Sequence, residues 1–135
     1  MNAKAYLSQA YRIEKAIHDM LEEVATLRAM ATKTTSVISD MPRSGIKNTS
    51  GLADTVAKLI EREELLYHEI DRLVDQRTEI CDAIQAVDDW EERRVLYLRY
   101  ISYRGWTAIA EEMHTCLRQV YRLHGRGLKK ISVPP

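Results

Sequence analysis

The sequence of 135 residues contains no Phe, only five Gly and three Pro, and only two Cys. Residues that favour helices, such as Ala, Leu, Glu and Arg, are common instead. This usage is typical of an all-helical protein and argues against a sheet protein. The length allows one ordinary domain, or a long helical hairpin that carries a small second unit.

Long apolar runs and metal-binding cysteine patterns are also missing. No run approaches the length of a membrane span, and the N-terminal MNAKAYLSQAYRIEKAIHDM is charged throughout, unlike a signal peptide. Cys81 and Cys116 lie far apart in sequence and match no zinc spacing. We therefore expect a cytoplasmic protein with reduced thiols and no membrane partner.

Charge of neither sign dominates, because 20 Lys and Arg balance 20 Asp and Glu. The two signs are nevertheless separated along the chain. From Ile101 to the end, six Lys and Arg face two Glu, a net charge of 6 − 2 = +4, whereas from Glu61 to Glu92 twelve acids face three Arg. The basic end suits a polyanionic partner, and the acidic segment would not lie along DNA.

Two stretches carry apolar residues at alternating steps of four and three, the pattern of a coiled-coil seam. The first stretch is 3–31, where Leu21 widens the stripe, and the second is 52–87. Their seam residues are Ile13, Ile17, Met20, Val24 and Leu27, then Leu52, Val56, Leu59, Leu66, Ile70, Leu73, Ile80, Ile84 and Val87. We predict a long antiparallel helical hairpin over residues 1–87.

Glu63 and Arg77 occupy seam positions where apolar residues are expected. Such residues can fix register or oligomeric state, or their side chains can extend to solvent from a partly open seam; we favour the second interpretation. Between the two stretches, residues 32–51 are rich in Ser, Thr, Pro and Gly and show no helical period, which predicts a loop.

Residues 88–135 predict three short helices that form a helix-turn-helix DNA-binding unit. Asp88 and Asp89 are placed to begin a helix over 90–101, and Thr107 can cap a second helix over 108–113. A turn then precedes a helix over 117–131. The predicted inward residues are Val95, Leu96, Leu98 and Tyr100, then Ile109, Ala110 and Met113, then Val120, Leu123, Leu128 and Ile131.

The last helix is rich in side chains that suit DNA. Arg118, Gln119 and Arg122 fall in its N-terminal half, where bidentate Arg and Gln contacts read guanine and adenine. The wider predicted DNA-binding set adds Tyr121, Arg126, Lys129 and Lys130, with backbone contacts at Thr107 and Thr115. The alternative is an ordinary solvated face, but this basic face coincides with the recognition position of a helix-turn-helix.

The segment RRVLYLRYISYRGWTAIAEEMHTCLRQVYRLHGRGLKKI resembles the region-four DNA-binding unit of sigma-70-type factors. The whole chain is similar to small phage late-gene transcription regulators of the ArpU and RinA kind. That likeness lies in the Met-Pro-Arg-Ser-Gly segment at 41–45 and in the Arg-Gln-Val-Tyr-Arg-Leu-His-Gly segment at 118–125. The resemblance implies a regulatory role.

One departure concerns the last helix. Cys116 stands where sigma-like units place Ser or Thr as the N-cap, and a thiol is a weak acceptor. Gly125 and Gly127 each cost up to about 1 kcal/mol relative to Ala inside a helix. We therefore expect a poor cap and a helix that bends or frays beyond Leu123.

No enzyme motif accompanies these features. Glu111 with His114, and Glu64 with His68, have metal-ligand spacing, but neither pair has the further ligands of a di-iron site. No Gly-rich phosphate loop, nucleophile elbow or zinc-hydrolase motif occurs. We predict a protein that is not an enzyme, with no cofactor and no metal site.

The sequence thus favours a sequence-specific DNA-binding transcriptional regulator of phage or prophage type. Its expected partners are double-stranded DNA and a second copy of the chain, as a homodimer or higher oligomer. The hairpin would either space two recognition helices or present a surface to RNA polymerase. The alternative is a helical scaffold or assembly protein, such as a small-terminase-like subunit, with the helix-turn-helix as an adaptor.

Overall fold

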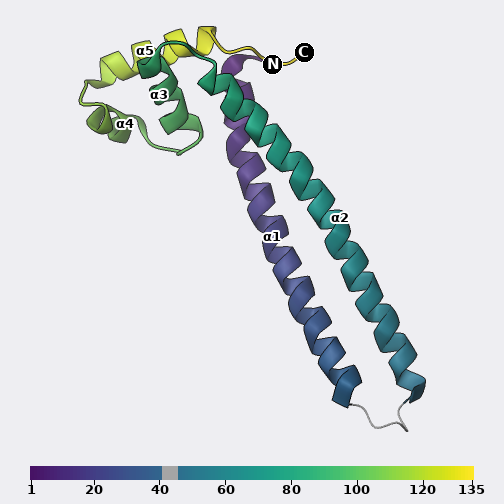
Figure 1. The fold of residues 1–135 in the computed structure, drawn as a ribbon. Helices are drawn as coiled ribbons and strands as arrows, with labels where there is room; N and C mark the ends of the chain where they lie inside the picture. The colour runs from purple at the N-terminus through teal and green to yellow at the C-terminus, as the bar shows by residue number, and fades with distance from the viewer. Residues whose placement is uncertain (41–45) are drawn as a thin grey trace. The chain divides into compact units, whose positions relative to one another are not determined.

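The computed structural model describes residues 1–40 and 46–135, and the side chains of 1–37 and 51–135. Within these residues the protein is all-helical and contains no strand, as the composition predicts. The helices are α1 (Ala3–Asp40), α2 (Ile46–Gln85), α3 (Trp90–Tyr100), α4 (Trp106–Glu112) and α5 (Leu117–Lys129) (Figure 1). No helix in this part of the chain is long and apolar enough to cross a membrane.

The loop expected over 32–51 differs from the structure, since α1 continues to Asp40 and α2 already begins at Ile46. Hydroxyl groups that favour a loop in the sequence bond instead to the helix backbone. These bonds are Thr34 Oγ1 to Met30 O, Thr35 Oγ1 to Ala31 O, and Ser36 Oγ to Thr32 O, at 2.8, 2.8 and 3.1 Å. Ser and Thr thereby satisfy their side chains within the helix. The motif expected at 41–45 lies outside the described residues.

The chain divides into two compact units. Unit 1 comprises Met1–Lys15 with Val74–Pro135, and unit 2 comprises Ala16–Leu73. In unit 2, α1 and α2 run in opposite directions and pack through a cluster of seam residues. That cluster contains Val24, Leu66 and Ile70, with Ile17, Met20, Leu27 and Tyr67 packed against it.

Two details of unit 2 depart from the expected pattern. Leu21 does not widen the buried stripe, because its side chain is 48% exposed. Glu63 does not extend to solvent: its side chain is only 16% exposed, and its Oε1 accepts a hydrogen bond of 2.7 Å from Arg28 Nε. The seam therefore holds this carboxylate beside a cation from the opposite helix, where its charge is offset.

The interior of unit 1 is shared by α3, α4 and α5. Its buried residues are Val95, Leu98, Ile109, Ala110, Val120 and Leu123, with Trp106 and Met113 partly buried against them. These are among the inward positions that the sequence predicts. Each short helix contributes one or two apolar turns, so none of the three could bury its apolar side alone.

The starts of the three short helices differ in how they are capped. The Asp89 carboxylate caps α3 as predicted, accepting hydrogen bonds from the amides of Glu91 and Glu92, both at 3.0 Å. Thr107 does not cap α4, because this helix already begins at Trp106, with Gly105 at the N-cap and no capping side chain. Trp106, the first residue of α4, packs partly buried against the interior.

The first residues of α1 belong to unit 1, although the predicted seam begins only at Ile13. Leu7 and Ala10 are fully buried. The Tyr103 hydroxyl contacts the Glu14 carboxylate and lies 3.2 Å from the Ala10 carbonyl oxygen. Tyr103 adopts a φ of 56°, a left-handed conformation that turns the chain between α3 and α4. Tyr103 thus ties α1 to the short helices.

The two glycines of α5 have different surroundings, and α5 continues past both of them to Lys129. A Cβ atom added at Gly127 would lie 2.9 Å from Leu96 Cδ1 and 3.2 Å from Leu96 Cγ. Leu96 is itself fully buried and has little room to move. A Cβ atom at Gly125 would meet no atom within 4 Å. Gly127 therefore permits the close packing of α5 on α3, whereas Gly125 has no such role.

This difference predicts opposite effects of one substitution at two nearby positions. Gly125→Ala should raise the free energy of unfolding by up to about 1 kcal/mol, because alanine is the better helix former. Gly127→Ala should lower it by about 1–3 kcal/mol, because overpacking against Leu96 outweighs the same gain. Urea unfolding of both variants measures the difference. Equal effects at the two positions would contradict the close contact.

Candidate nucleic-acid interface

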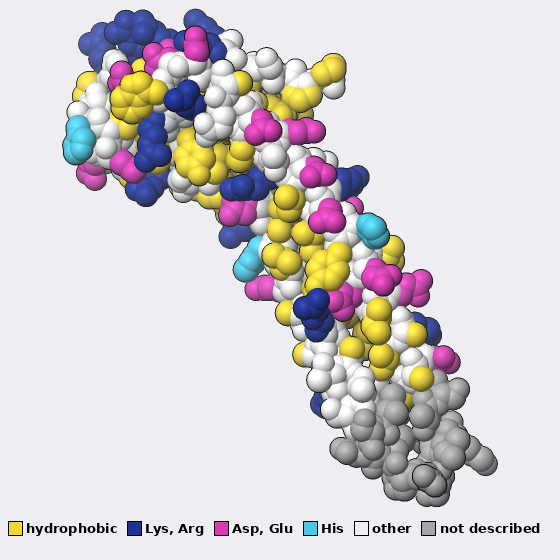
Figure 2. Space-filling model, in the orientation of Figure 1, with side chains coloured by type: hydrophobic (Ala, Val, Ile, Leu, Met, Phe, Trp, Pro, Cys, Tyr) yellow, Lys and Arg dark blue, Asp and Glu magenta, His cyan; other side chains and the backbone are white. Residues whose placement is uncertain are grey.

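Four cationic side chains follow one side of α5. Arg118, Arg122, Arg126 and Lys129 are all exposed and recur at steps of four, four and three residues. At 3.6 residues per turn they span an arc of about 80°. We call these four residues the basic arc. The opposite side of the helix carries the buried residues Val120, Leu123 and Gly127. Figure 2 shows Lys and Arg side chains gathered over the α5 end of unit 1.

The cations of the basic arc carry unneutralised charge. Among the described residues, none of the four lies within ion-pair distance of an acid. The segment from Leu117 to Lys130 contains no Asp or Glu. By contrast, Arg94 and Arg104 both contact the Glu112 carboxylate, at 3.2 and 3.1 Å. Four of the cations of unit 1 that have no ion pair among the described residues therefore lie together on one side of α5.

Lys130, which the sequence assigns to DNA phosphates, is engaged inside the protein. Its Nζ lies 2.7 Å from Glu92 Oε2 and 3.4 Å from Asp88 Oδ1. Glu92 is only 3% exposed, and apart from this ion pair its Oε2 has no hydrogen-bond partner among the described residues. The contact with Glu92 raises the pKa of Lys130, and Lys130 lowers the pKa of Asp88. Lys130 thus neutralises a buried carboxylate.

The remaining predicted site residues surround the start of α5. Gln119 is half-buried beside the basic arc, and Tyr121 is 50% exposed with its ring 5.3 Å from that of Trp106. Thr107 is exposed on α4. Thr115 differs, because its amide donates to the Ala110 carbonyl oxygen at 3.0 Å. The Thr115 amide is therefore not free for a phosphate.

The first turn of α5 has no capping side chain. Cys116 occupies the N-cap position, and its thiol makes no capping hydrogen bond, as expected for a weak acceptor. The amides at the start of a helix have no partners within the helix and carry partial positive charge. This end of α5 can therefore accept an anion from outside the chain.

Beneath α5 lies an aromatic cluster that sequence reasoning missed. The Trp106 ring has Arg99 Cζ 4.2 Å from its centroid and the His124 ring at 4.7 Å. The Tyr100 hydroxyl lies 2.7 Å from His124 Nε2. In the sequence His124 has no partner nearby, because its partners come from α3 and α4. Only the spacing of Tyr121 and His124 along α5 hints that both reach the same neighbour.

Lys130 and Lys129 allow the effect on stability of a lysine in an ion pair to be compared with that of an exposed lysine without one. Lys130→Met should lower the free energy of unfolding, because it leaves the Glu92 carboxylate buried without a countercharge. Lys129→Met should have little effect, since Lys129 is exposed and has no ion-pair partner among the described residues. Adding Glu92→Gln to Lys130→Met should recover part of the loss. Thermal unfolding of the four proteins checks this; equal losses for both lysine variants would contradict it.

His124 predicts an acid-sensitive stability. Burial, with a further contribution from the charges of Lys4 and Arg99, lowers the pKa of His124 from 6.5 to about 4. The unfolded chain therefore binds a proton first as pH falls, so stability declines between about pH 6.5 and 4 and is retained above it. His124→Gln should flatten this decline in urea unfolding series, and the exposed His68→Gln should not. An unchanged slope in His124→Gln would contradict the burial of a neutral imidazole.

Within the described residues, no group of three or more His, Cys, Asp or Glu side chains could hold a metal ion. Comparison with protein-family models, with curated proteins and with solved structures finds no match to this chain. The resemblance to sigma region four and to phage late regulators therefore stays a prediction, and function has to be argued from the geometry of α3–α5 alone.

Proposed function

We propose that this protein is a sequence-specific DNA-binding transcriptional regulator in which α4 and α5 act as a helix-turn-helix. The observation that carries the proposal is the unpaired basic arc, which lies opposite the buried side of α5. A helix packed in this way presents its cations outward without further rearrangement. The burial of Val120 and Leu123 in the shared interior stabilises α5 in this orientation.

In the proposed complex, α5 lies in the major groove with its N-terminal half nearest the bases. Arg118 and Arg122 suit guanine, Gln119 suits adenine, and Arg126 and Lys129 are placed further along for phosphates. Lys130 leaves this set, because it holds Glu92. The uncapped amides of α5 supply a further phosphate contact.

Tyr121 and Thr107 complete the proposed surface. Tyr121 lies one step around α5 from the basic arc, and its contact with Trp106 holds the ring in place. Its exposed side chain suits a phosphate or sugar at the groove edge. Thr107, exposed on the first turn of α4, suits the backbone of the opposite strand, as expected for the first helix of such a unit.

A single recognition helix buries little surface for tight, specific binding, so the proposal includes a homodimer that reads two half-sites. A second function, a scaffold or assembly protein of the small-terminase kind, is favoured by exposed apolar side chains on the long helices. The exposure of Arg118 and Arg122 favours DNA reading over this alternative, because DNA can reach both side chains. Regulation of phage or prophage genes, and contact with RNA polymerase, follow only from the resemblance.

The proposal predicts different losses for three substitutions of single cations. In vitro selection from random duplexes first supplies the bound sequence. Arg122→Ala should then weaken specific binding by about 5–150-fold, the equivalent of 1–3 kcal/mol for a lost base contact, and relax one position of the site. Lys129→Ala should weaken binding to all sequences alike and reduce the salt slope by about 0.9.

Lys58→Ala, an exposed cation on α2 in unit 2, serves as the control and should change neither quantity. Fluorescence anisotropy at several salt concentrations measures all three variants. Failure of selection to enrich any sequence, or full specific binding by Arg122→Ala, would overturn the proposed readout and leave the scaffold function as the better account.

A further inference from the structure

Unit 2 carries apolar side chains that its seam does not bury. Leu21 on α1 and Ile60 on α2 are each 48% exposed, and Tyr67 is only partly buried. Each follows a seam residue directly, so all three lie on the same flank of the seam. Arg28 shares this flank, with its Cζ 5.7 Å from the Tyr67 ring centroid. We call Leu21, Arg28, Ile60 and Tyr67 the side strip.

The side strip crosses from one helix to the other. The Arg28–Tyr67 contact joins its α1 and α2 parts, and Figure 2 shows hydrophobic side chains along both long helices on the visible face. An apolar flank beside a seam that is already filled is typical of helices that pack in a larger bundle. Within the helix pair Tyr67 packs against the seam cluster, whereas Leu21 and Ile60 each stay 48% exposed.

The two edges of the side strip differ in charge. On α2 the outer edge carries the exposed acids Glu64 and Asp71. On α1 the corresponding edge carries His18, Ala25 and Thr32, and His18 Nε2 lies 3.2 Å from Glu22 Oε1. Arg28 is bonded to Glu63, so its exposed guanidinium lies at the same position along the helix axes as Glu64. The α2 edge is therefore acidic, and the α1 edge presents the remaining N–H donors of the Arg28 guanidinium, whose Nε is bonded to Glu63.

We propose that a second copy of this chain packs on the side strip, with α1 of each copy lying against α2 of its partner. A two-fold axis parallel to the helices produces this arrangement. It places Arg28 near the partner's Glu64. Leu21 lies about two turns before Arg28 on α1, and the antiparallel α2 carries Tyr67 and Ile70 at that height. Leu21 therefore lies near the partner's Tyr67. Charge and apolar surface are then both matched.

The other face-to-face arrangement, with α2 against α2, would bring Glu64 and Asp71 of the two copies together. Like charges facing one another are unfavourable, so charge selects the first arrangement. The face is large enough for a dimer. The 22 residues of α1 from 16 to 37 extend about 33 Å at 1.5 Å per residue, and two adjacent helices are roughly 20 Å wide. About 650 Å² per copy approaches the roughly 800 Å² of a standard interface.

This inference specifies the surface of the proposed homodimer but does not depend on DNA reading. Sedimentation equilibrium of the full chain measures dimerisation without DNA. The wild type should be dimeric at concentrations on the order of tens of micromolar. Ile60→Glu should raise the dimer dissociation constant about tenfold or more, because it buries an unpaired charge.

Leu65→Glu is the matched control, because Leu65 is 57% exposed on the same helix but lies off the side strip. It should leave the dissociation constant unchanged, and circular dichroism should show equal helix content in all proteins. A monomeric wild type, or equal weakening by the two variants, would overturn the proposal. Loss of DNA binding in Arg122→Ala with an intact dimer would leave it standing, so the two proposals fail separately.

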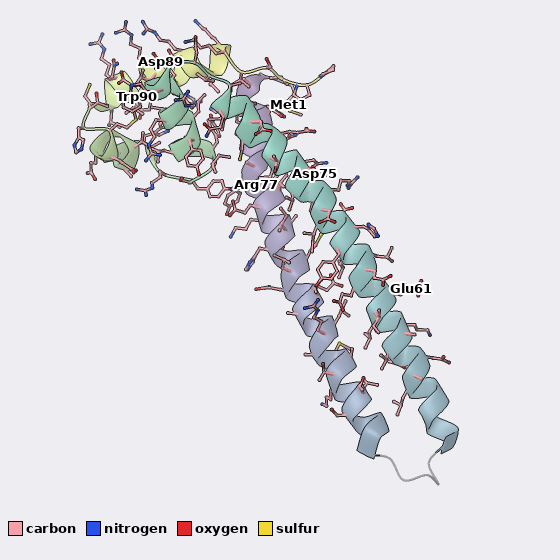
Figure 3. All side chains as sticks on the ribbon, viewed as in Figure 1. Met1, Glu61, Asp75, Arg77, Asp89 and Trp90 are labelled. Atoms are coloured by element: carbon pink, nitrogen blue, oxygen red, sulfur yellow. The ribbon has the colours of Figure 1, made fainter. Side chains whose placement is uncertain are left out.

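The orientation has its own test in Glu64→Gln. This change removes the charge from both copies, so it should weaken the dimer when Glu64 faces the partner's Arg28, and should tighten it when Glu64 faces the partner's Glu64. Glu61→Gln makes the same change of charge on the side of α2 that faces away from α1 (Figure 3) and should have little effect. A tighter dimer in Glu64→Gln would overturn the arrangement of α1 against the partner's α2.

Discussion

The packing of the buried side of α5, which carries Val120, Leu123 and Gly127, decides which side of this helix faces solvent. Because Gly127 has no side chain, α5 packs closely on α3 in the setting that turns Gly127 toward Leu96. Val120 and Leu123, on the same side, enter the shared interior and add apolar burial to that setting. The basic arc, on the opposite side of α5, therefore faces solvent. Its exposure is a consequence of how the opposite side is packed.

A second consequence concerns charge. The sequence from Ile101 to the end has a net charge of +4, but the count does not say which cations are available to a partner. The structure pairs Arg104 with Glu112, and Lys130 with Glu92 and Asp88. Such pairs contribute little to the external field, because each cation is neutralised locally. The remaining cations of this segment lie on one helix, so its positive charge is more localised than the net charge implies.

Much of the fold could be predicted from hydrophobic period, because burial follows one side of each helix. The all-helical class, the Asp89 cap and the interior of α3–α5 follow from such local patterns. Features that depend on spatial neighbours could not be predicted in this way. Gly127 looks like a weak point of a helix until Leu96 is placed against it, and Lys130 looks like a free cation until the buried Glu92 is seen.

The loop expected over 32–51 shows a different limit. Ser and Thr hydroxyls compete for the backbone in two ways, since they can end a helix or bond to the carbonyl oxygen four residues earlier. The sequence does not distinguish the two, and in α1 the second occurs. The same ambiguity affects Thr107. Its hydroxyl can cap a helix, but α4 begins one residue earlier, at Trp106, which packs against the interior.

The start of α5 is well packed from the side, but its N-terminal amides have no side-chain cap. Trp106, held between Arg99, Tyr121 and His124, supports the first two turns from the side. The amides of the first turn receive no side-chain cap, since Cys116 makes no capping bond. Side contacts therefore set the direction of the helix, and its terminal N–H groups remain for an external acceptor. A phosphate bound there would supply the acceptor that Ser or Thr supplies in a capped helix. In the proposed complex the weak Cys116 cap would favour binding, because a strong internal cap would compete with DNA phosphates for the same donors.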